Sequence, residues 1–282
     1  MPRGYAEADL AQVHYVREGR GTPLLLLAAS GRSSRMFAPL IGLLAPHFDL
    51  CAPDTPGFGN SGPLPPGTSI EELAGCFVQL LDRLGIERTD IYGLHTGNKI
   101  AAAMAVGWPD RMGRVVLAGQ SHSLIPDRER RNATILGIVR EYVEPRSGDT
   151  AALAEWAVAW QRLTAIWWDR QLVAAGATAA DRDAARLLAL DELQAEGTAA
   201  LYAANFAYDL GRDYARIAAP TLVLEVATPD EDRTVGRQGP EVQCLIPGGA
   251  ALETLHEPEG HTLTLENRAR DLAAILLRWL RR

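Results

Sequence analysis

The stretch DIYGLHTGNKIAAAMA, residues 90–105, decides the fold because it joins the end of a short strand pattern to an alanine-rich helix pattern. Between the two patterns stands Gly93-x-His95-x-Gly97. Small residues two positions to each side of a central residue let a strand and a helix approach closely, and the central side chain is then exposed above the edge of a sheet. This is the outline of a nucleophile elbow, whose central residue is normally serine. Here the central residue is His95.

Strand and helix patterns alternate on both sides of this stretch. The run TPLLLLAAS, residues 22–30, is typical of a parallel strand that is covered on both faces. The alternation predicts an α/β fold with a mostly parallel sheet flanked by helices. The expected strands cover residues 11–19, 22–30, 48–54, 89–94 and 113–120, and the expected helices before the elbow cover residues 34–47 and 69–85.

The alternation stops near residue 123 and resumes near residue 215. The sequence between these points is almost wholly helical in character, and two further strand patterns and a long amphipathic helix then close the chain. We therefore expect a core made of residues 1–122 and 215–282, with residues 123–214 inserted as a helical cap.

Composition and charge exclude several classes of protein. The formal net charge is −7 and no run of Lys or Arg forms a basic stripe, so we expect no nucleic-acid partner. The start of the chain lacks the plan of a signal peptide, and no apolar run reaches the roughly 18 residues of a membrane span, which predicts a cytoplasmic protein without a membrane partner. Cys51, Cys76 and Cys244 are far apart and odd in number, so we interpret them as small core residues. Whether the protein forms a homodimer stays an open question at this point.

Three motifs together resemble the α/β-hydrolase superfamily, in the branch with a helical cap. PDTPGFGNSG, residues 53–62, is similar to the family's turn after its fourth strand, the elbow follows at residues 93–97, and EGHTLTLEN, residues 259–267, resembles the family's Gly-His segment. The resemblance covers nearly the whole chain outside the expected cap. It implies an α/β-hydrolase fold, with catalytic residues in the order elbow, acid, histidine.

The resemblance also implies which residues are catalytic. It places His95 at the nucleophile position and His261 at the general-base position. The acid is expected after the strand pattern at residues 219–227. Asp230 and Asp232 are both available there, and we prefer Asp230 because it lies nearer the end of the strand.

An oxyanion hole follows from the same resemblance. Its donors are expected to be the backbone N–H groups of Thr96, just after the elbow centre, and of Ser30, after the first long apolar strand. Ala28 and Ala29 stand where members of the family often carry His-Gly. Since the donor is a backbone group, this substitution need not abolish the hole.

Three further residues are candidate contacts for the substrate. His122 follows a strand pattern at the carboxyl edge of the sheet, where ligands sit in open α/β folds, and the rival interpretation is a solvated residue at the hinge of the cap. Arg32 lies in the loop after Ser30, where a cation can meet a substrate carboxylate, and the rival interpretation is a solvated arginine, which is the more common outcome. Trp167 belongs to a group of cap tryptophans whose helical spacing favours packing, with one or two of them facing the pocket.

We expect no metal and no cofactor. His95, His122 and His261 are a set that can suggest zinc or iron. In the family that the chain resembles, however, His261 would turn one ring nitrogen to the acid and the other to the nucleophile. The three rings would then not point toward one common position that an ion could occupy.

Three functions stay open at this point. The first is hydrolysis of an ester, a thioester or a similar acyl bond in a small, partly hydrophobic molecule, with His95 attacking or activating water. The second is acid–base chemistry without hydrolysis, as in a lyase, a cyclase or a cofactor-free oxygenase, which explains the loss of serine more naturally. The third is a catalytically inactive ligand-binding protein. Hydrolysis is the commonest activity in the superfamily that the chain resembles, and this favours the first function.

Overall fold

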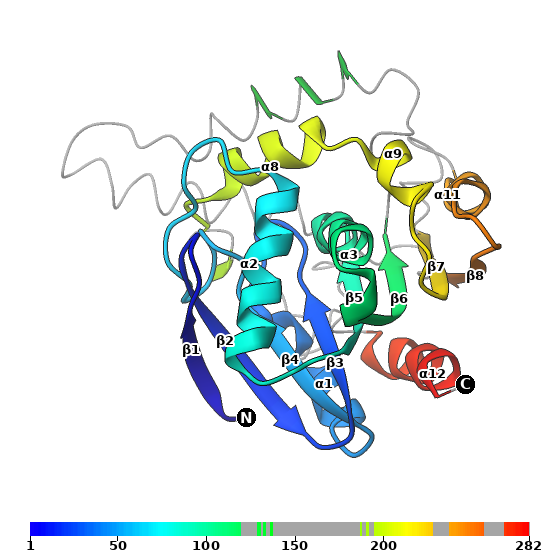
Figure 1. The fold of residues 1–282 in the computed structure, drawn as a ribbon, viewed down its shortest axis with the longest axis horizontal. Helices are drawn as coiled ribbons and strands as arrows, with labels where there is room; N and C mark the ends of the chain where they lie inside the picture. Colours follow the sequence, from blue (N-terminus) through cyan, green and yellow to red (C-terminus); the bar gives the residue numbers. More distant parts are fainter. Residues whose placement is uncertain are drawn as a thin grey trace, which may run out of the picture.

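The computed structural model describes residues 1–119, 195–227, 237–256 and 268–281, together with residues 129, 130, 132, 133, 136, 137, 187, 190 and 191. In these residues a single eight-stranded sheet runs in the order β1-β2-β4-β3-β5-β6-β7-β8 (Figure 1). Its strands are β1 (Arg3–Glu7), β2 (Gln12–Gly19), β3 (Thr22–Leu27), β4 (Phe48–Pro53), β5 (Thr89–Leu94), β6 (Met112–Ala118), β7 (Thr221–Ala227) and β8 (Ala251–His256).

Most of the sheet is parallel, as the alternation of patterns predicts. Among the described strands, the antiparallel pairs are those that β2 makes with β1 on one side and with β4 on the other. Each of the remaining neighbours, from β4 to β8, is paired in parallel. The carboxyl ends of β3, β5, β6 and β7 therefore meet at one edge, and this edge carries the residues of interest.

Helices cover both faces of the sheet (Figure 1). One core joins the sheet to α2 and α3, and a second core on the other face joins it to α1 and α12. The described helices are η1 (Ser34–Phe37), α1 (Ala38–Leu44), α2 (Ile70–Arg83), α3 (Thr96–Gly107), η2 (Pro109–Arg111), α8 (Thr198–Ala207), α9 (Leu210–Tyr214), α11 (Gly239–Leu245) and α12 (Ala269–Leu280).

Strand β3 shows why the apolar run at its sequence is continuous. Leu25 and Leu27 belong to the core beneath α2 and α3, whereas Leu24 and Leu26 belong to the core beneath α1 and α12. All four leucines are at most 1% exposed. Because successive side chains of a strand point to opposite faces, a strand with both faces covered needs apolar residues at every position.

Helix α2 begins where its sequence places a capping box. The Ser69 hydroxyl accepts from the Glu72 backbone N–H at 3.1 Å, and the Glu72 carboxylate accepts from the Ser69 N–H at 2.7 Å. These two bonds satisfy N–H groups that have no partner within the helix. The expected helix at residues 69–85 is thereby confirmed to within a residue or two at each end.

Two elements and one cysteine differ from expectation. The edge strand β1 was not predicted, because its residues RGYAE are mostly exposed and carry little apolar pattern. The seven-residue helix α11 was also missed, since GPEVQCL is too short to show a helical period. Cys244 lies in α11 and is exposed, so its interpretation as a core residue is wrong, whereas Cys51 and Cys76 are buried as expected.

The expected cap lies mostly outside the described residues. Between β6 and β7, the described residues include the helices α8 and α9, and α9 ends at Tyr214. The boundaries of a cap at residues 123 and 214 stay a prediction. None of the helices in the described ranges is long and apolar enough to cross a membrane.

Candidate active site

His95 occupies a strained turn between β5 and α3. Its φ is 48° and its ψ is −104°, and it is the only non-glycine residue with a positive φ in the described part of the chain. A side chain in such a conformation costs on the order of 1–3 kcal/mol and persists only where its surroundings enforce it. The turn therefore has the strand-to-helix geometry that the sequence predicts for an elbow.

The two elbow glycines are required by close contact. A Cβ atom at Gly93 would lie 2.2 Å from the carbonyl oxygen of Gly97, and a Cβ at Gly97 would lie 2.3 Å from the carbonyl oxygen of Leu27. Real Cβ atoms do not approach backbone oxygens this closely. This confirms that small residues flank His95 so that β3, β5 and α3 can pack against one another.

The imidazole of His95 lies over the end of the neighbouring strand β6. The His95 backbone N–H donates to the Ala118 carbonyl at 2.9 Å. Gly119 comes next in the chain, and a Cβ atom built there would be 2.7 Å from His95 Nδ1 and 2.8 Å from Cε1. Because Gly119 has no side chain, the imidazole ring of His95 can occupy this space.

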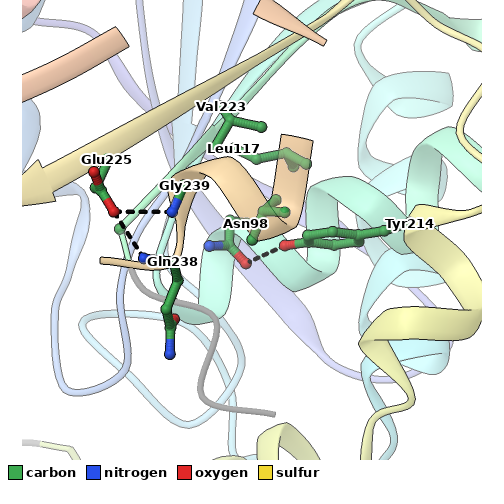
Figure 2. A pocket seen from close by; sticks show the side chains of 9 residues that line it. Asn98, Leu117, Tyr214, Val223, Glu225, Gln238 and Gly239 are labelled. Atoms are coloured by element: carbon green, nitrogen blue, oxygen red, sulfur yellow. Dashed lines mark hydrogen bonds between the residues drawn. The ribbon is translucent and has the colours of Figure 1, made fainter. Parts of the chain in front are cut away.

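Asn98 fixes the first turn of α3 to the elements around it. Its side-chain N–H donates to the Ala118 carbonyl at 2.9 Å, and its side-chain oxygen accepts from the Tyr214 hydroxyl at 3.1 Å (Figure 2). All three groups are buried. The amide therefore ties the elbow helix to the end of β6 and to α9.

A small pocket adjoins this amide on the α3 side of the sheet. Glu225 accepts there from the backbone N–H groups of Gln238 and Gly239 at 2.9 and 2.8 Å (Figure 2). The cavity measures about 10 Å³, which is at the lower limit for one water molecule and too small for an organic substrate. It is lined by Asn98, Leu117, Gly119, Tyr214, Val223, Glu225, Gln238, Gly239 and Val242.

The two residues expected to form the oxyanion hole lie side by side. The hydroxyl oxygens of Ser30 and Thr96 are 2.6 Å apart, which is a hydrogen bond between the loop after β3 and the start of α3. Thr96 is the first residue of α3, where a backbone N–H has no partner within the helix and the helix dipole favours negative charge. The use of these N–H groups as oxyanion donors stays a prediction.

Arg32 lies close to a carboxylate of the chain itself. The residue is 7% exposed, and its Nε is 3.6 Å from Asp191 Oδ2. A contact between Arg32 and a substrate stays a prediction. His122, Trp167, Asp230, Asp232 and His261 lie outside the described residues.

The structure adds two buried carboxylates that sequence reasoning did not single out. Asp54 follows β4 in the motif PDTPGFGNSG, so an acid directly after a buried strand was the available signal. Asp191 stands among other charged residues in a helical stretch, and nothing in its sequence context marks it. Both carboxylates contact the loop that carries Ser30.

The comparison with protein families agrees with this geometry. The family model described as the α/β hydrolase fold matches residues 22–224. The chain belongs to the α/β-hydrolase fold family. The family assignment confirms the fold expected from the three motifs, and the histidine at the centre of the elbow is a feature of this chain's own sequence.

Curated relatives are similar over a limited part of the chain. Haloalkane dehalogenase 2 of Mycobacterium tuberculosis is 36% identical over 112 residues, which are 39% of this chain and 39% of that protein. The dihydrolipoyllysine-residue acetyltransferase component of the acetoin cleaving system of Cupriavidus necator is 32% identical over 114 residues, 40% of this chain and 30% of that protein. The match thus spans about two-fifths or less of these relatives' length.

Solved structures are similar over the whole chain. A hydrolase from Pseudomonas aeruginosa PA01 superposes with a TM-score of 0.76 at 26% identity, over 99% of this chain and 98% of that one. The enol-lactonase from Burkholderia xenovorans LB400 superposes with a TM-score of 0.74 at 23% identity, over 99% of this chain and 100% of that one. The second likeness shows the fold alone.

Proposed function

We propose that this protein hydrolyses an acyl bond, an ester or a thioester, in a small and partly hydrophobic molecule, with His95 at the nucleophile position. One observation carries the proposal. His95 is held at a positive φ in an intact elbow, directly before Thr96 and the hydroxyl contact to Ser30. The likeness to a solved hydrolase at 26% identity supports the reaction class.

The proposed first step transfers the acyl group to His95. A ring nitrogen of His95 attacks the carbonyl carbon, and the electron pair of the C=O bond moves to the oxygen, which the N–H groups of Thr96 and Ser30 would hold. The bond from carbon to the leaving group then breaks. The His95 ring gives up a proton, His261 carries it, and the leaving group departs as an alcohol or a thiol.

The second step releases the acid. Water attacks the acyl carbon, His261 takes a proton from it, and the ring of His95 leaves with that proton and is restored. An acyl-imidazole reacts with water far more readily than a serine ester does. Acylation is therefore the difficult step, and the proposal favours substrates with good leaving groups.

The decisive measurement is the release of acid from activated esters, followed by pH-stat with p-nitrophenyl acetate and its thioester analogue. The native protein should release acid, and His95→Ala should not. Consumption of a substrate without release of acid would instead favour acid–base chemistry of the non-hydrolytic kind. Ligand binding without any turnover would favour a binding protein.

A serine-directed phosphonate gives an independent test of the elbow. The native protein should form no stable adduct, because phosphoryl-histidine is labile. His95→Ser restores the usual hydroxyl and should become labelled at residue 95, whereas His95→Ala should stay unlabelled. Stable labelling of the native protein at another residue would place the nucleophile elsewhere, and a fully active His95→Ala would remove His95 from the mechanism.

A further inference from the structure

The loop that carries Ser30 has no regular secondary structure of its own. We call residues 28–34, from the end of β3 to the first residue of η1, the oxyanion loop. Gly31 has a φ of 76°, and the Arg32 N–H donates to the Ala29 carbonyl at 3.2 Å, so the loop makes one tight turn. A loop this short takes its position from the groups that bind its far end.

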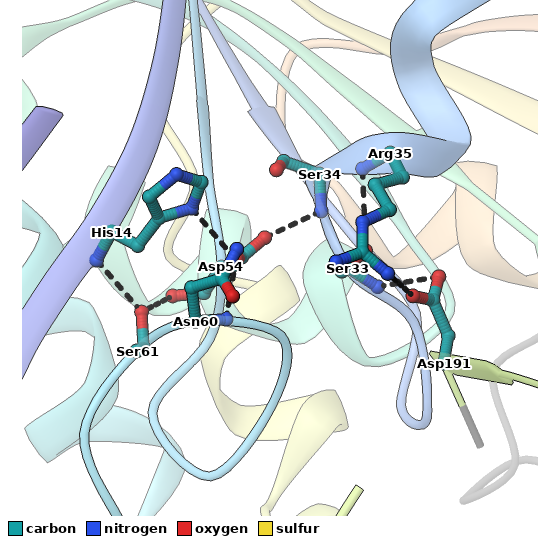
Figure 3. A network of polar contacts seen from close by, with 8 residues as sticks. All are labelled: His14, Ser33, Ser34, Arg35, Asp54, Asn60, Ser61 and Asp191. Carbon is teal, nitrogen blue, oxygen red and sulfur yellow. Dashed lines mark hydrogen bonds and ion pairs between the residues drawn. The ribbon is translucent and has the colours of Figure 1, made fainter. Parts of the chain in front are cut away.

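The far end of the loop lies between two carboxylates that approach from opposite sides (Figure 3). On one side, Asp54 Oδ1 accepts from the Ser34 N–H at 2.6 Å. On the other side, Asp191 accepts from the Ser33 N–H at 3.1 Å and from the Ser33 hydroxyl at 2.8 Å. Two successive backbone N–H groups are thereby held by two different parts of the chain.

The Asp54 anchor belongs to the core of the fold. Its Oδ2 also accepts from the Asn60 N–H at 2.8 Å and lies 2.8 Å from His14 Nδ1. His14 comes from β2, and the Ser61 hydroxyl bonds to both the His14 N–H and the Asp54 carbonyl (Figure 3). This anchor is therefore built from β2, the end of β4 and the turn that follows it.

The Asp191 anchor comes from the stretch between β6 and β7, 158 positions away from Ser33 in the sequence. Asp191 is only 3% exposed. A buried carboxylate needs charge and hydrogen-bond partners, and Asp191 has both, since Arg32 Nε is 3.6 Å and Arg35 Nη1 is 3.7 Å from its oxygens.

We propose that Asp191 is a positioning residue that holds the oxyanion loop so that Ser30 stays beside Thr96. The inference rests on the proposed function, because it concerns the same oxyanion hole. The core supplies one anchor through Asp54, and the inserted stretch supplies the other through Asp191. Arg32 is then the counter-ion of this anchor.

The first test measures the loop itself, without any substrate. Amide hydrogen exchange of a peptide that contains Ser33 and Ser34 is compared between the native protein and Asp191→Asn. The exchange should become about tenfold faster in the variant, because the single oxygen of the asparagine side chain can replace only one of the two acceptors that Ser33 uses and carries no charge. Asp209→Asn is the matched control, because Asp209 caps α9 through the Arg212 N–H and contacts no residue of the loop in the described structure. It should leave the exchange of this peptide unchanged.

The second test separates positioning from folding. With p-nitrophenyl acetate, Asp191→Asn should lower kcat by about 10- to 100-fold and leave KM within about threefold, since a displaced oxyanion donor weakens only the transition state. Ser33→Ala removes the hydroxyl and should act in the same direction with a smaller effect. The loss of kcat in the double variant, expressed as a free energy, should be smaller than the sum of the losses in the two single variants, because both changes break the same contact. If Asp191→Asn does not fold, Ser33→Ala carries the test alone.

The outcomes distinguish this inference from the proposed function. Unchanged exchange in Asp191→Asn, or faster exchange with an unchanged kcat in an active enzyme, overturns the role of Asp191. A native protein that hydrolyses no ester contradicts the proposed function, and the exchange measurement then decides alone whether Asp191 holds the loop.

Discussion

His95 and Gly119 are complementary: the imidazole of the first fills the place where the second carries no side chain. A Cβ atom at Gly119 would be 2.7 Å from His95 Nδ1 and 3.1 Å from Cγ. A histidine is much larger than the serine that normally stands at the centre of an elbow. In this chain the extra volume is accommodated at the end of the neighbouring strand β6.

Gly119→Ala is therefore expected to displace the His95 ring and to abolish most of the proposed activity. Part of the loss in stability comes from the backbone, because the φ of Gly119 is 78° and a side chain there costs about 1–2 kcal/mol. Gly248→Ala separates the two effects, since Gly248 has a φ of 82° and nothing within 4 Å of its Cβ position. Both variants should lower the midpoint temperature of thermal unfolding. Only Gly119→Ala should also lower the activity. Equal activity in the two variants would mean that the position of the ring does not matter.

The second prediction concerns the reactivity of the three cysteine thiols, which differ in burial. Burial raises the pKa of Cys51 to about 12 and the pKa of Cys76 to about 12, so both are protonated and covered at neutral pH. Cys244 is exposed. A thiol reagent such as Ellman's should therefore react quickly with one thiol of the native protein and with all three in denaturant. Reaction of two or more thiols in the native protein would contradict the described packing.

The fold could be predicted from the sequence because its strands are buried on both faces. Strand β5 was expected at residues 89–94 and lies there, and the run of four leucines in β3 is explained by two cores. The edge strand β1 could not be predicted in the same way, since an exposed edge strand needs few apolar residues. A periodic pattern of apolar residues indicates burial, so it does not reveal a strand that is mostly exposed.

The candidate site could be predicted only where it is local in sequence. His95, Thr96 and the two elbow glycines belong to one turn, so their spacing is sufficient to place them together. The contact between Ser33 and Asp191 joins residues 158 positions apart, and no spacing rule connects them. Arg32 illustrates the limit, because its place in the loop after Ser30 follows from the sequence, whereas its approach to Asp191 at 3.6 Å does not.

Asp90 gives a prediction about pH. It lies in β5 and is 7% exposed, and burial raises the pKa of its carboxyl although the Arg114 N–H donates to it at 2.6 Å. The native state therefore binds the proton more tightly than the unfolded state does. The free energy of unfolding should fall as the pH rises from the ordinary pKa of about 3.9 through the raised native value, and the cost is complete once the pH is well above that raised value.

Asp90→Asn removes the charge and keeps an oxygen that can accept from the Arg114 N–H. The variant should be more stable than the native protein at pH 7 in urea unfolding, and the difference should shrink as the pH is lowered toward about 3.9. A difference that is the same at both pH values would mean that the charge of Asp90 is not its cause.

The last prediction compares two glycines of the same helix. A Cβ atom at Gly97 would be 2.3 Å from the Leu27 carbonyl oxygen and 2.9 Å from that of Ala28, so Gly97→Ala must push α3 away from the end of β3. We expect a loss of about 1–3 kcal/mol in the free energy of unfolding. The proposed activity should fall as well, because the displacement separates Thr96 from Ser30. Gly107 ends the same helix with nothing within 4 Å of its Cβ position, and Gly107→Ala should be neutral or slightly stabilising. Urea unfolding of both variants checks this pair, and similar changes in the two would show that the close approach at the elbow does not determine the effect.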